Sequence, residues 1–207
     1  FNILLQTKVG ADVTFEVSGE TFTAHRCVLA ARSKVFMAQL FGPMKEGTTT
    51  SGVIHIKDMR ASVFVALLRF IYTDSCPEID ADYMDEEHML QVLEEGLEKE
   101  TRDEEMWLQW LQDLFVAADR FDPQRLKCIC EMQLSDNIGV SSVMSTLALA
   151  EQHHCHGLKA ACLKFIQIQP PSRLQTLMAT NGWGHIVTTY PSVLNELITK
   201  LASNQRK

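Results

Sequence analysis

Residues 12–40 constrain the fold more than any other stretch, because the spacing of their apolar side chains changes abruptly. Val13, Phe15 and Val17 alternate with polar residues, which is the period of a strand with one buried face. Residues 18–20, Ser-Gly-Glu, are typical of a short turn, so the segment from Glu20 to Thr23 is predicted to return as a second strand. The sequence therefore predicts a β-hairpin.

After Thr23 the apolar residues of the same stretch recur at helical spacing. Ser33 is a favourable N-cap residue, because its hydroxyl can accept a hydrogen bond from the first turn of a helix. We therefore predict that two short helices follow the hairpin, from the spacing of Val28, Leu29, Arg32, Phe36 and Leu40.

The order of these residues resembles the core of a BTB/POZ domain. The pattern reads D-V-x-F-x-V and then F-x-A-H-x-x-V-L-A-A-R-S-x-V-F. The form A-H-R-C-V-L-A-A-R-S is similar to plant MATH-BTB proteins in particular. The resemblance implies an α+β fold, in which a small mixed sheet is flanked by helices. The matching residues are Asp12, Val13, Phe15, Val17, Phe22, Ala24, His25, Val28, Leu29, Ala30, Ala31, Arg32, Ser33, Val35 and Phe36.

The sequence between residues 53 and 134 continues with one short strand and several helices. Residues 53–56 are predicted to form a strand with two isoleucines on one face. An amphipathic helix follows, helical spacing resumes at Trp107, and a further helix follows Asp122 and Pro123, which suit a helix start. The segments F-V-A-A-D-R-F and R-L-K-C-I-C-E resemble the last two helices of a BTB domain.

From Ser141 onward the apolar spacing predicts helix pairs. One helix begins at Ser141 and a second follows Gly157. A third ends near Asn181, and a fourth begins at Pro191. The segment ALAEQHHCHGLKAACLKFI, residues 148–166, is similar to plant MATH-BTB chains. The helix pairs resemble a 3-box and the start of a BACK region. The resemblance thus implies a BTB/POZ domain at 11–138 and a 3-box/BACK-like helical extension at 139–207, after an N-terminal dimerisation segment at 1–10.

Residues 80–105 form an acidic segment inside the predicted BTB/POZ domain. They contain twelve acidic residues and two basic ones, a local net charge of −10 in a chain whose net charge is −7. We expect a solvated, partly disordered insertion, longer than the loop of the family pattern. The alternative is an acidic lure for a basic partner. The overall charge argues against a nucleic-acid partner.

The sequence carries no pattern that predicts catalysis, a cofactor or a metal. It lacks G-x-x-x-x-G-K-[ST], G-x-G-x-x-G, H-E-x-x-H and G-x-S-x-G. Four consecutive helical residues, His-His-Cys-His at 153–156, cannot converge on one zinc ion. We therefore favour a polar helix end over zinc held by His153 or His156 with a distant cysteine. His25 is predicted to be a hydrogen-bonded core histidine.

The cysteines and the hydropathy pattern bear on location. None of the six cysteines forms a C-x-x-C pair, and we expect reduced thiols in the nucleus or the cytoplasm. No run of about 18 apolar residues predicts a membrane span, and the N-terminus does not resemble a signal peptide. Because the chain starts with Phe and not Met, we expect a fragment. The resemblance implies that a MATH domain would precede it.

The tripeptide Met44-Lys45-Glu46 lies where BTB adaptors that bind cullin-3 resemble one another in a hydrophobic-x-Glu triplet. In an extended loop the i, i+2 spacing makes Met44 and Glu46 face the same way. The resemblance implies that Met44 enters a pocket on the cullin while Glu46 accepts hydrogen bonds beside it, helped by Phe41 and Tyr72. The alternative is a mobile surface loop.

The N-terminal residues Phe1, Ile3, Leu4 and Leu5 are apolar and have no place in the predicted hairpin. The resemblance implies that they pack on the partner subunit of a BTB homodimer, with Val28 also facing the partner. The alternative is a disordered linker.

The function implied by the resemblance is that of a substrate-specific adaptor of a cullin-3 RING ubiquitin ligase. Such an adaptor makes or breaks no covalent bond, and the missing MATH domain would bind the ubiquitination substrate. Two alternatives remain: the BTB dimerisation module of a transcriptional regulator, and a BTB homologue that dimerises without binding cullin. The helix pairs after Ser141 favour the adaptor.

Overall fold

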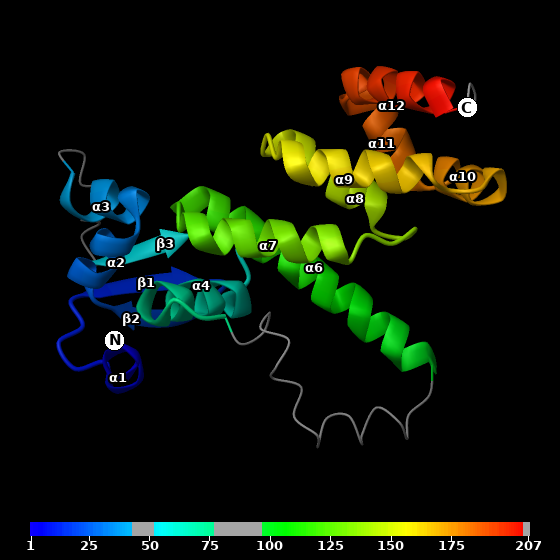
Figure 1. The fold of residues 1–207 in the computed structure, drawn as a ribbon. Coiled ribbons are helices and arrows are strands. Elements are labelled where there is room, and N and C mark those ends of the chain that lie inside the picture. The colour runs from blue at the N-terminus through cyan, green and yellow to red at the C-terminus, as the bar shows by residue number, and fades with distance from the viewer. Residues whose placement is uncertain (43–51, 77–96, 205–207) are drawn as a thin grey trace. The chain divides into compact units, whose positions relative to one another are not determined.

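The computed structural model describes residues 1–42, 52–76 and 97–204, apart from the side chains of residues 97–103 and 201–204 (Figure 1). The chain divides into two compact units, Phe1–Cys130 and Glu131–Lys207. Each unit has its own hydrophobic residues buried from solvent. Among the described residues, no helix combines the length and the apolar character needed to cross a bilayer.

The first unit contains a small mixed sheet. Strands β1 (Val13–Val17) and β2 (Glu20–Ala24) pair antiparallel through a tight turn at Ser18 and Gly19, both of which have positive φ. Strand β3 (Val53–Ile56) pairs parallel with β1, so the order is β2-β1-β3. The predicted hairpin and the predicted short strand are both confirmed.

Helices surround this sheet, and the predicted cap at Ser33 is confirmed. Its hydroxyl accepts a hydrogen bond from the Phe36 backbone nitrogen at 3.0 Å, which starts the second of the two short helices. In Figure 1, α1 lies beside α4, against which it packs. The described helices that begin in this unit are α1 (Asn2–Thr7), α2 (Arg26–Arg32), α3 (Lys34–Phe41), α4 (Ala61–Thr73), α6 (Leu97–Phe121) and α7 (Gln124–Asp136).

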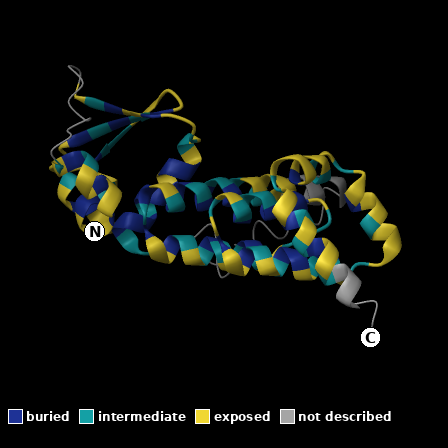
Figure 2. Cartoon of the chain, turned by 90° about the horizontal axis from the view of Figure 1, so that it is seen from above, coloured by how far each residue is buried: buried dark blue, intermediate teal, exposed yellow. Residues whose placement is uncertain are grey.

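Aromatic rings fill the core between sheet and helices. Phe15 of β1 contacts both Phe36 and Phe64, with ring centroids 5.7 Å and 5.3 Å away. Phe36 in turn stacks on Phe121 at 4.6 Å. These ring contacts join α3 and the end of α6 to the central strand. Along the helices, buried residues recur between exposed ones, as Figure 2 shows.

Helix α6 begins earlier than the sequence pattern indicates. The helix was predicted from Trp107, but it starts at Leu97, so the last part of the acidic segment is helical and not a disordered insertion. No Gly or Pro interrupts residues 97–121, and Leu, Glu, Lys and Gln are good helix formers. The high local charge therefore masks the apolar spacing in the sequence but does not prevent the helix from forming.

The second unit is a helical array around one apolar cluster. The cluster includes Leu147, Leu163, Leu177, Ile186 and Leu197, all at most 2% exposed. Helices α8, α9 and α12 begin close to the predicted positions, and α10 ends at Met178, close to the predicted end near Asn181. The helices are α8 (Val143–Gln152), α9 (His156–Gln167), α10 (Pro171–Met178), α11 (Asn181–Thr189) and α12 (Pro191–Asn204).

Helix α11 is an addition to the four helices predicted for this part of the chain. Two glycines and several β-branched residues in Asn181–Thr189 lower its helix propensity. Thr180 nevertheless caps it by accepting a hydrogen bond from the Trp183 nitrogen at 3.3 Å. A Cβ at Gly182 would lie 2.6 Å from the Met144 Cβ, so the glycine permits close packing on α8. Tertiary contact therefore outweighs local propensity.

Candidate functional site

Phe41, one of the residues predicted to meet a partner protein, lies at the end of α3. Its side chain is 54% exposed, although it is a large hydrophobic residue. The Arg26 guanidinium lies over the Phe41 ring, 5.1 Å from its centroid, and also donates to the Leu40 carbonyl. The Arg26 backbone nitrogen donates to an Asp12 carboxylate oxygen at 2.7 Å. These contacts hold an exposed aromatic ring in one place.

Met44 and Glu46 lie outside the described residues, which end at residue 42 and resume at residue 52. Helix α3 ends at Phe41 and β3 begins at Val53, so the triplet lies on the connection between them. Their placement relative to Phe41 thus also lies outside the described residues, and their contact with a partner stays a prediction.

Tyr72, also predicted to help at the interface, lies in the core of α4 and is only 3% exposed. The Tyr72 hydroxyl accepts a hydrogen bond from the His25 backbone nitrogen at 2.8 Å and lies 2.7 Å from His25 Nδ1. Burial raises the pKa of this hydroxyl. Tyr72 thus supports the fold from inside and does not share a surface with Phe41.

His25 is the hydrogen-bonded core histidine that the sequence predicts, and its contacts fix its tautomer. Nε2 lies 2.9 Å from the Val9 carbonyl oxygen, which can only accept, so Nε2 carries the hydrogen. In the neutral ring Nδ1 is then an acceptor, and the Tyr72 hydroxyl donates to it. The ring therefore ties the segment before β1 to helix α4.

The N-terminal segment forms helix α1, not a linker. Phe1 and Ile3 are 75% and 74% exposed, while Leu4 and Leu5 are partly buried where α1 packs against α4. Val28 is only 7% exposed in this single chain. The exposed apolar surface predicted for dimerisation is thus present at Phe1 and Ile3, whereas Val28 belongs to the core of the subunit.

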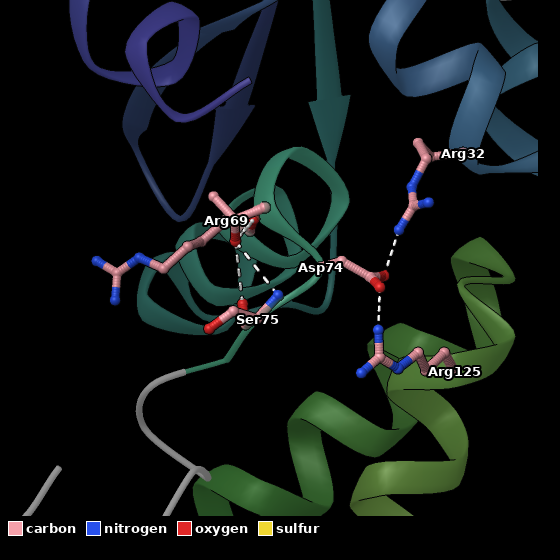
Figure 3. Close-up of polar contacts among 6 residues, drawn as sticks. Arg32, Arg69, Asp74, Ser75 and Arg125 are labelled. Carbon is pink, nitrogen blue, oxygen red and sulfur yellow. Dashed lines mark hydrogen bonds and ion pairs between the residues drawn. The ribbon is translucent and has the colours of Figure 1, made fainter. Parts of the chain in front are cut away.

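A polar cluster forms where α4 ends, and sequence reasoning did not find it. Asp74 has a left-handed backbone with φ of 62° and caps α4, and its carboxylate forms ion pairs with Arg32 of α2 and Arg125 of α7 (Figure 3). Just beside it, Thr73 donates to the Arg69 carbonyl at 2.7 Å. The three charged partners are far apart in sequence, so no local pattern reveals them.

The histidine-rich residues of the second unit lie at the turn between α8 and α9. His153 is the C-cap of α8, His154 has φ of 55°, and α9 begins at His156. This placement agrees with the predicted polar helix end. Within residues 1–42, 52–76 and 97–204, no group of three or more His, Cys, Asp or Glu residues is arranged to hold a metal ion.

Glu131 organises the start of α9 from a distant position. Its Oε1 accepts a hydrogen bond from the Leu158 backbone nitrogen at 3.2 Å. The N-cap residue of α9, Cys155, provides no side-chain hydrogen bond. Glu131 therefore satisfies one of the free N–H groups of the first turn, where a negative charge is also favourable.

Two domain families match the chain. The BTB/POZ domain family matches residues 1–101, and the family described as "BPM/SPOP, BACK domain" matches residues 142–198. The two matches cover both described units in part. They agree with a small mixed sheet flanked by helices and followed by a helical array.

Several proteins of Arabidopsis thaliana are similar to almost the whole chain. "BTB/POZ and MATH domain-containing protein 3" is 38% identical over 97% of this chain and 44% of its own length. "BTB/POZ and MATH domain-containing protein 4" is 35% identical over 98% of this chain and 39% of its own length. "BTB/POZ and MATH domain-containing protein 6" is 32% identical over 98% of this chain and 45% of its own length. The chain thus spans less than half the length of these relatives.

Proposed function

Because the chain belongs to the BTB/POZ family and continues into a BACK domain of the BPM/SPOP type, we propose that it is a substrate-specific adaptor of a cullin-3 RING ubiquitin ligase. In this role the chain binds the cullin and forms a homodimer. It makes or breaks no covalent bond itself. The location that we propose is the nucleus or the cytoplasm; the free thiols of its six cysteines support this proposal.

The exposed ring of Phe41 carries the proposal. It is a large apolar side chain at the surface, 54% exposed, and Arg26 holds it in place immediately before the loop with Met44 and Glu46. Aromatic and apolar side chains of this kind are typical anchors of protein interfaces. Phe41 and Met44 would provide the apolar part of the cullin contact, and Glu46 would provide the hydrogen-bond acceptor.

Proximity is the proposed mechanism. The relatives are described as containing a MATH domain as well as a BTB/POZ domain, and they extend well beyond this chain. A MATH domain in the whole protein would hold the substrate while the BTB/POZ domain holds the cullin. Dimerisation would present two of each, which raises the effective concentration of substrate at the ligase.

Calorimetric titration against the N-terminal domain of cullin-3 tests this function. Burying one methionine side chain contributes about 1.5–3 kcal/mol, and a hydrogen bond to a charged group contributes roughly as much. The double variant Met44→Ala/Glu46→Ala should therefore bind more weakly by about two to three orders of magnitude or more.

Lys45→Ala is the matched control, because in the extended segment that the sequence predicts, the side chain between Met44 and Glu46 is expected to face away from theirs. It should bind like the parent. If the double variant also binds like the parent, the triplet is only a surface loop. If the parent does not bind, the chain is a BTB homologue that does not engage cullin-3.

A further inference from the structure

Four helix ends in the first unit enclose a cleft of about 420 Å³. Helix α2 ends at Arg32, α3 begins at Lys34, α4 ends just before Asp74, and α7 begins just before Arg125. The residues that line it include none of those proposed above to contact the cullin. Its charged lining residues are Arg32, Lys34, Asp74, Asp122 and Arg125.

The cleft is basic in an acidic chain. Three of its lining side chains are cationic and two are acidic, which gives a local charge of +1, whereas the whole chain has a net charge of −7. The N-terminal ends of α3 and α7 also border it, but the partial positive charge that they add is offset by the C-terminal ends of α2 and α4. The excess of cationic side chains, and not the helix ends, therefore favours an anionic ligand.

The cleft already holds one carboxylate, that of Asp74. One oxygen of Asp74 accepts from Arg32 and the other accepts from Arg125, as Figure 3 shows. Each ion pair joins a single guanidinium nitrogen to a single carboxylate oxygen, and a guanidinium has five N–H donors. Both arginines therefore keep donors with which to bind a second acidic group.

Exposure makes these donors accessible. The side chains of Arg32 and Arg125 are 43% and 65% exposed. Lys34 is also exposed, and its ammonium forms no ion pair within the part of the chain that the structure describes. Three cations thus border the cleft, and the described carboxylates leave part of their hydrogen-bonding capacity unused.

We propose that this cleft binds an acidic segment of a partner protein, through an aspartate or glutamate side chain of that segment. The bound carboxylate shares Arg32 and Arg125 with Asp74 and forms an ion pair with Lys34. A carboxylate is the expected ligand because the two arginines already position one, and the planar guanidinium matches its geometry. Asp74 then sets the affinity, since it competes for the same donors.

Fluorescence anisotropy with the full chain and a labelled oligoglutamate peptide tests the proposal. The parent should bind the peptide, and added salt should weaken binding. Arg32→Gln and Arg125→Gln should each weaken it about threefold to fivefold, as expected for partly exposed ion pairs. Asp74→Asn should tighten binding by a similar factor, because asparagine tolerates the left-handed backbone but does not compete as an anion.

Arg60→Gln is the matched control. Arg60 forms a comparable ion pair with Asp113, with side chains 48% and 35% exposed, but it does not line the cleft. The Arg60→Gln variant should bind the oligoglutamate peptide with the affinity of the parent. As a control for the peptide, an uncharged oligoglutamine peptide should not bind the parent. Arg32→Lys keeps the charge without the planar fork, so its affinity should fall between those of the parent and Arg32→Gln. Thermal melting checks the folding of each variant.

Four results would overturn the proposal. The first is no binding by the parent, even if Asp74→Asn binds, because Asp74 would then close the site. The second is an equal effect of Arg60→Gln and Arg32→Gln, which would show attraction by net charge alone. The third is an affinity for Arg32→Lys that is no higher than that for Arg32→Gln. The fourth is displacement of the peptide by inorganic phosphate as effectively as by free oligoglutamate, which would indicate a general oxyanion site.

Discussion

The Tyr72 hydroxyl is 2.7 Å from His25 Nδ1 and 2.8 Å from the His25 backbone nitrogen. One hydroxyl group therefore satisfies two polar groups of a residue that is itself only 6% exposed. Because a buried polar group without a partner is costly, this pair should matter to stability more than a surface contact does.

Tyr72→Phe should lower the free energy of unfolding by about 1–3 kcal/mol, because it keeps the ring but leaves His25 Nδ1 and the His25 N–H without their partner. Denaturant unfolding measures this value. Tyr190→Phe is the control, since Tyr190 is only partly buried, and it should change stability little. Equal effects of the two substitutions would argue against the His25–Tyr72 contact.

We predict that the exposed apolar side chains of α1 form part of the homodimer interface. Replacing Phe1 with Ser and Ile3 with Lys should yield monomers by light scattering, because these side chains are 75% and 74% exposed in the single chain. Removing residues 1–5 should do the same. Val28→Lys should instead lower the melting temperature, because Val28 is only 7% exposed. A dimer that survives both N-terminal changes would exclude α1 from the interface.

The part of the acidic segment that precedes α6, residues 80–96, should be dispensable for folding. Replacing residues 80–96 with a short Gly/Ser link should leave the melting temperature within a few degrees, because so many charges cannot be buried without partners. Extending the replacement to residue 105 removes the first turns of α6, which begins at Leu97, and should cost more. A large loss from the shorter replacement would place some of its apolar residues in the core.

The start of α9 depends on Glu131. Glu131→Ala should cost about 1 kcal/mol, the usual value of a helix cap, and Glu131→Gln should cost less because it keeps an acceptor. Gly157→Ala should displace Glu131 Oε1, which would lie 2.9 Å from the new Cβ, so the lost cap should offset the gain in helix propensity and leave stability little changed. At Gly184 a Cβ meets nothing within 4 Å, so Gly184→Ala should be neutral or stabilising. Unfolding midpoints of the four variants decide the matter.

Thiol reactivity should follow burial. Cys27 and Cys128 are exposed and should react quickly with a thiol reagent, whereas Cys76, Cys130, Cys155 and Cys162 are buried and should react only on unfolding. Burial raises the pKa of Cys130 and of Cys162 to about 12. In the unfolded chain both thiols lose their protons at a lower pH, so stability should fall as the pH rises from about 9 toward 12. Fast labelling of Cys162 in the folded protein would contradict this.

Local signals predicted much of the fold. The hairpin, the helix start at Ser33 and most helices of the second unit follow from apolar spacing and capping residues, which act over a few positions. Helix α11 and the beginning of α6 were missed because glycine content and charge are poor guides once tertiary contacts contribute.

The sites were less predictable. Phe41 is exposed as an interface residue should be, but Tyr72 and Val28 are buried, because residue type alone does not give the orientation of a side chain. The ion pairs of Asp74 join residues more than forty positions apart. Contacts of this range depend on the folded chain and leave no periodic signal in the sequence.

The stacking of Phe36 on Phe121 has a consequence for synthesis in the cell. The Ser33 hydroxyl also donates to the Phe121 carbonyl, so the hairpin and its first helices gain contacts from a residue made much later. A ribosome adds about 5–20 residues per second, so these helices wait several seconds for the end of α6 to emerge. During that interval the half-built subunit exposes the aromatic face that Phe121 later covers, which makes it a candidate client for chaperones acting on nascent chains.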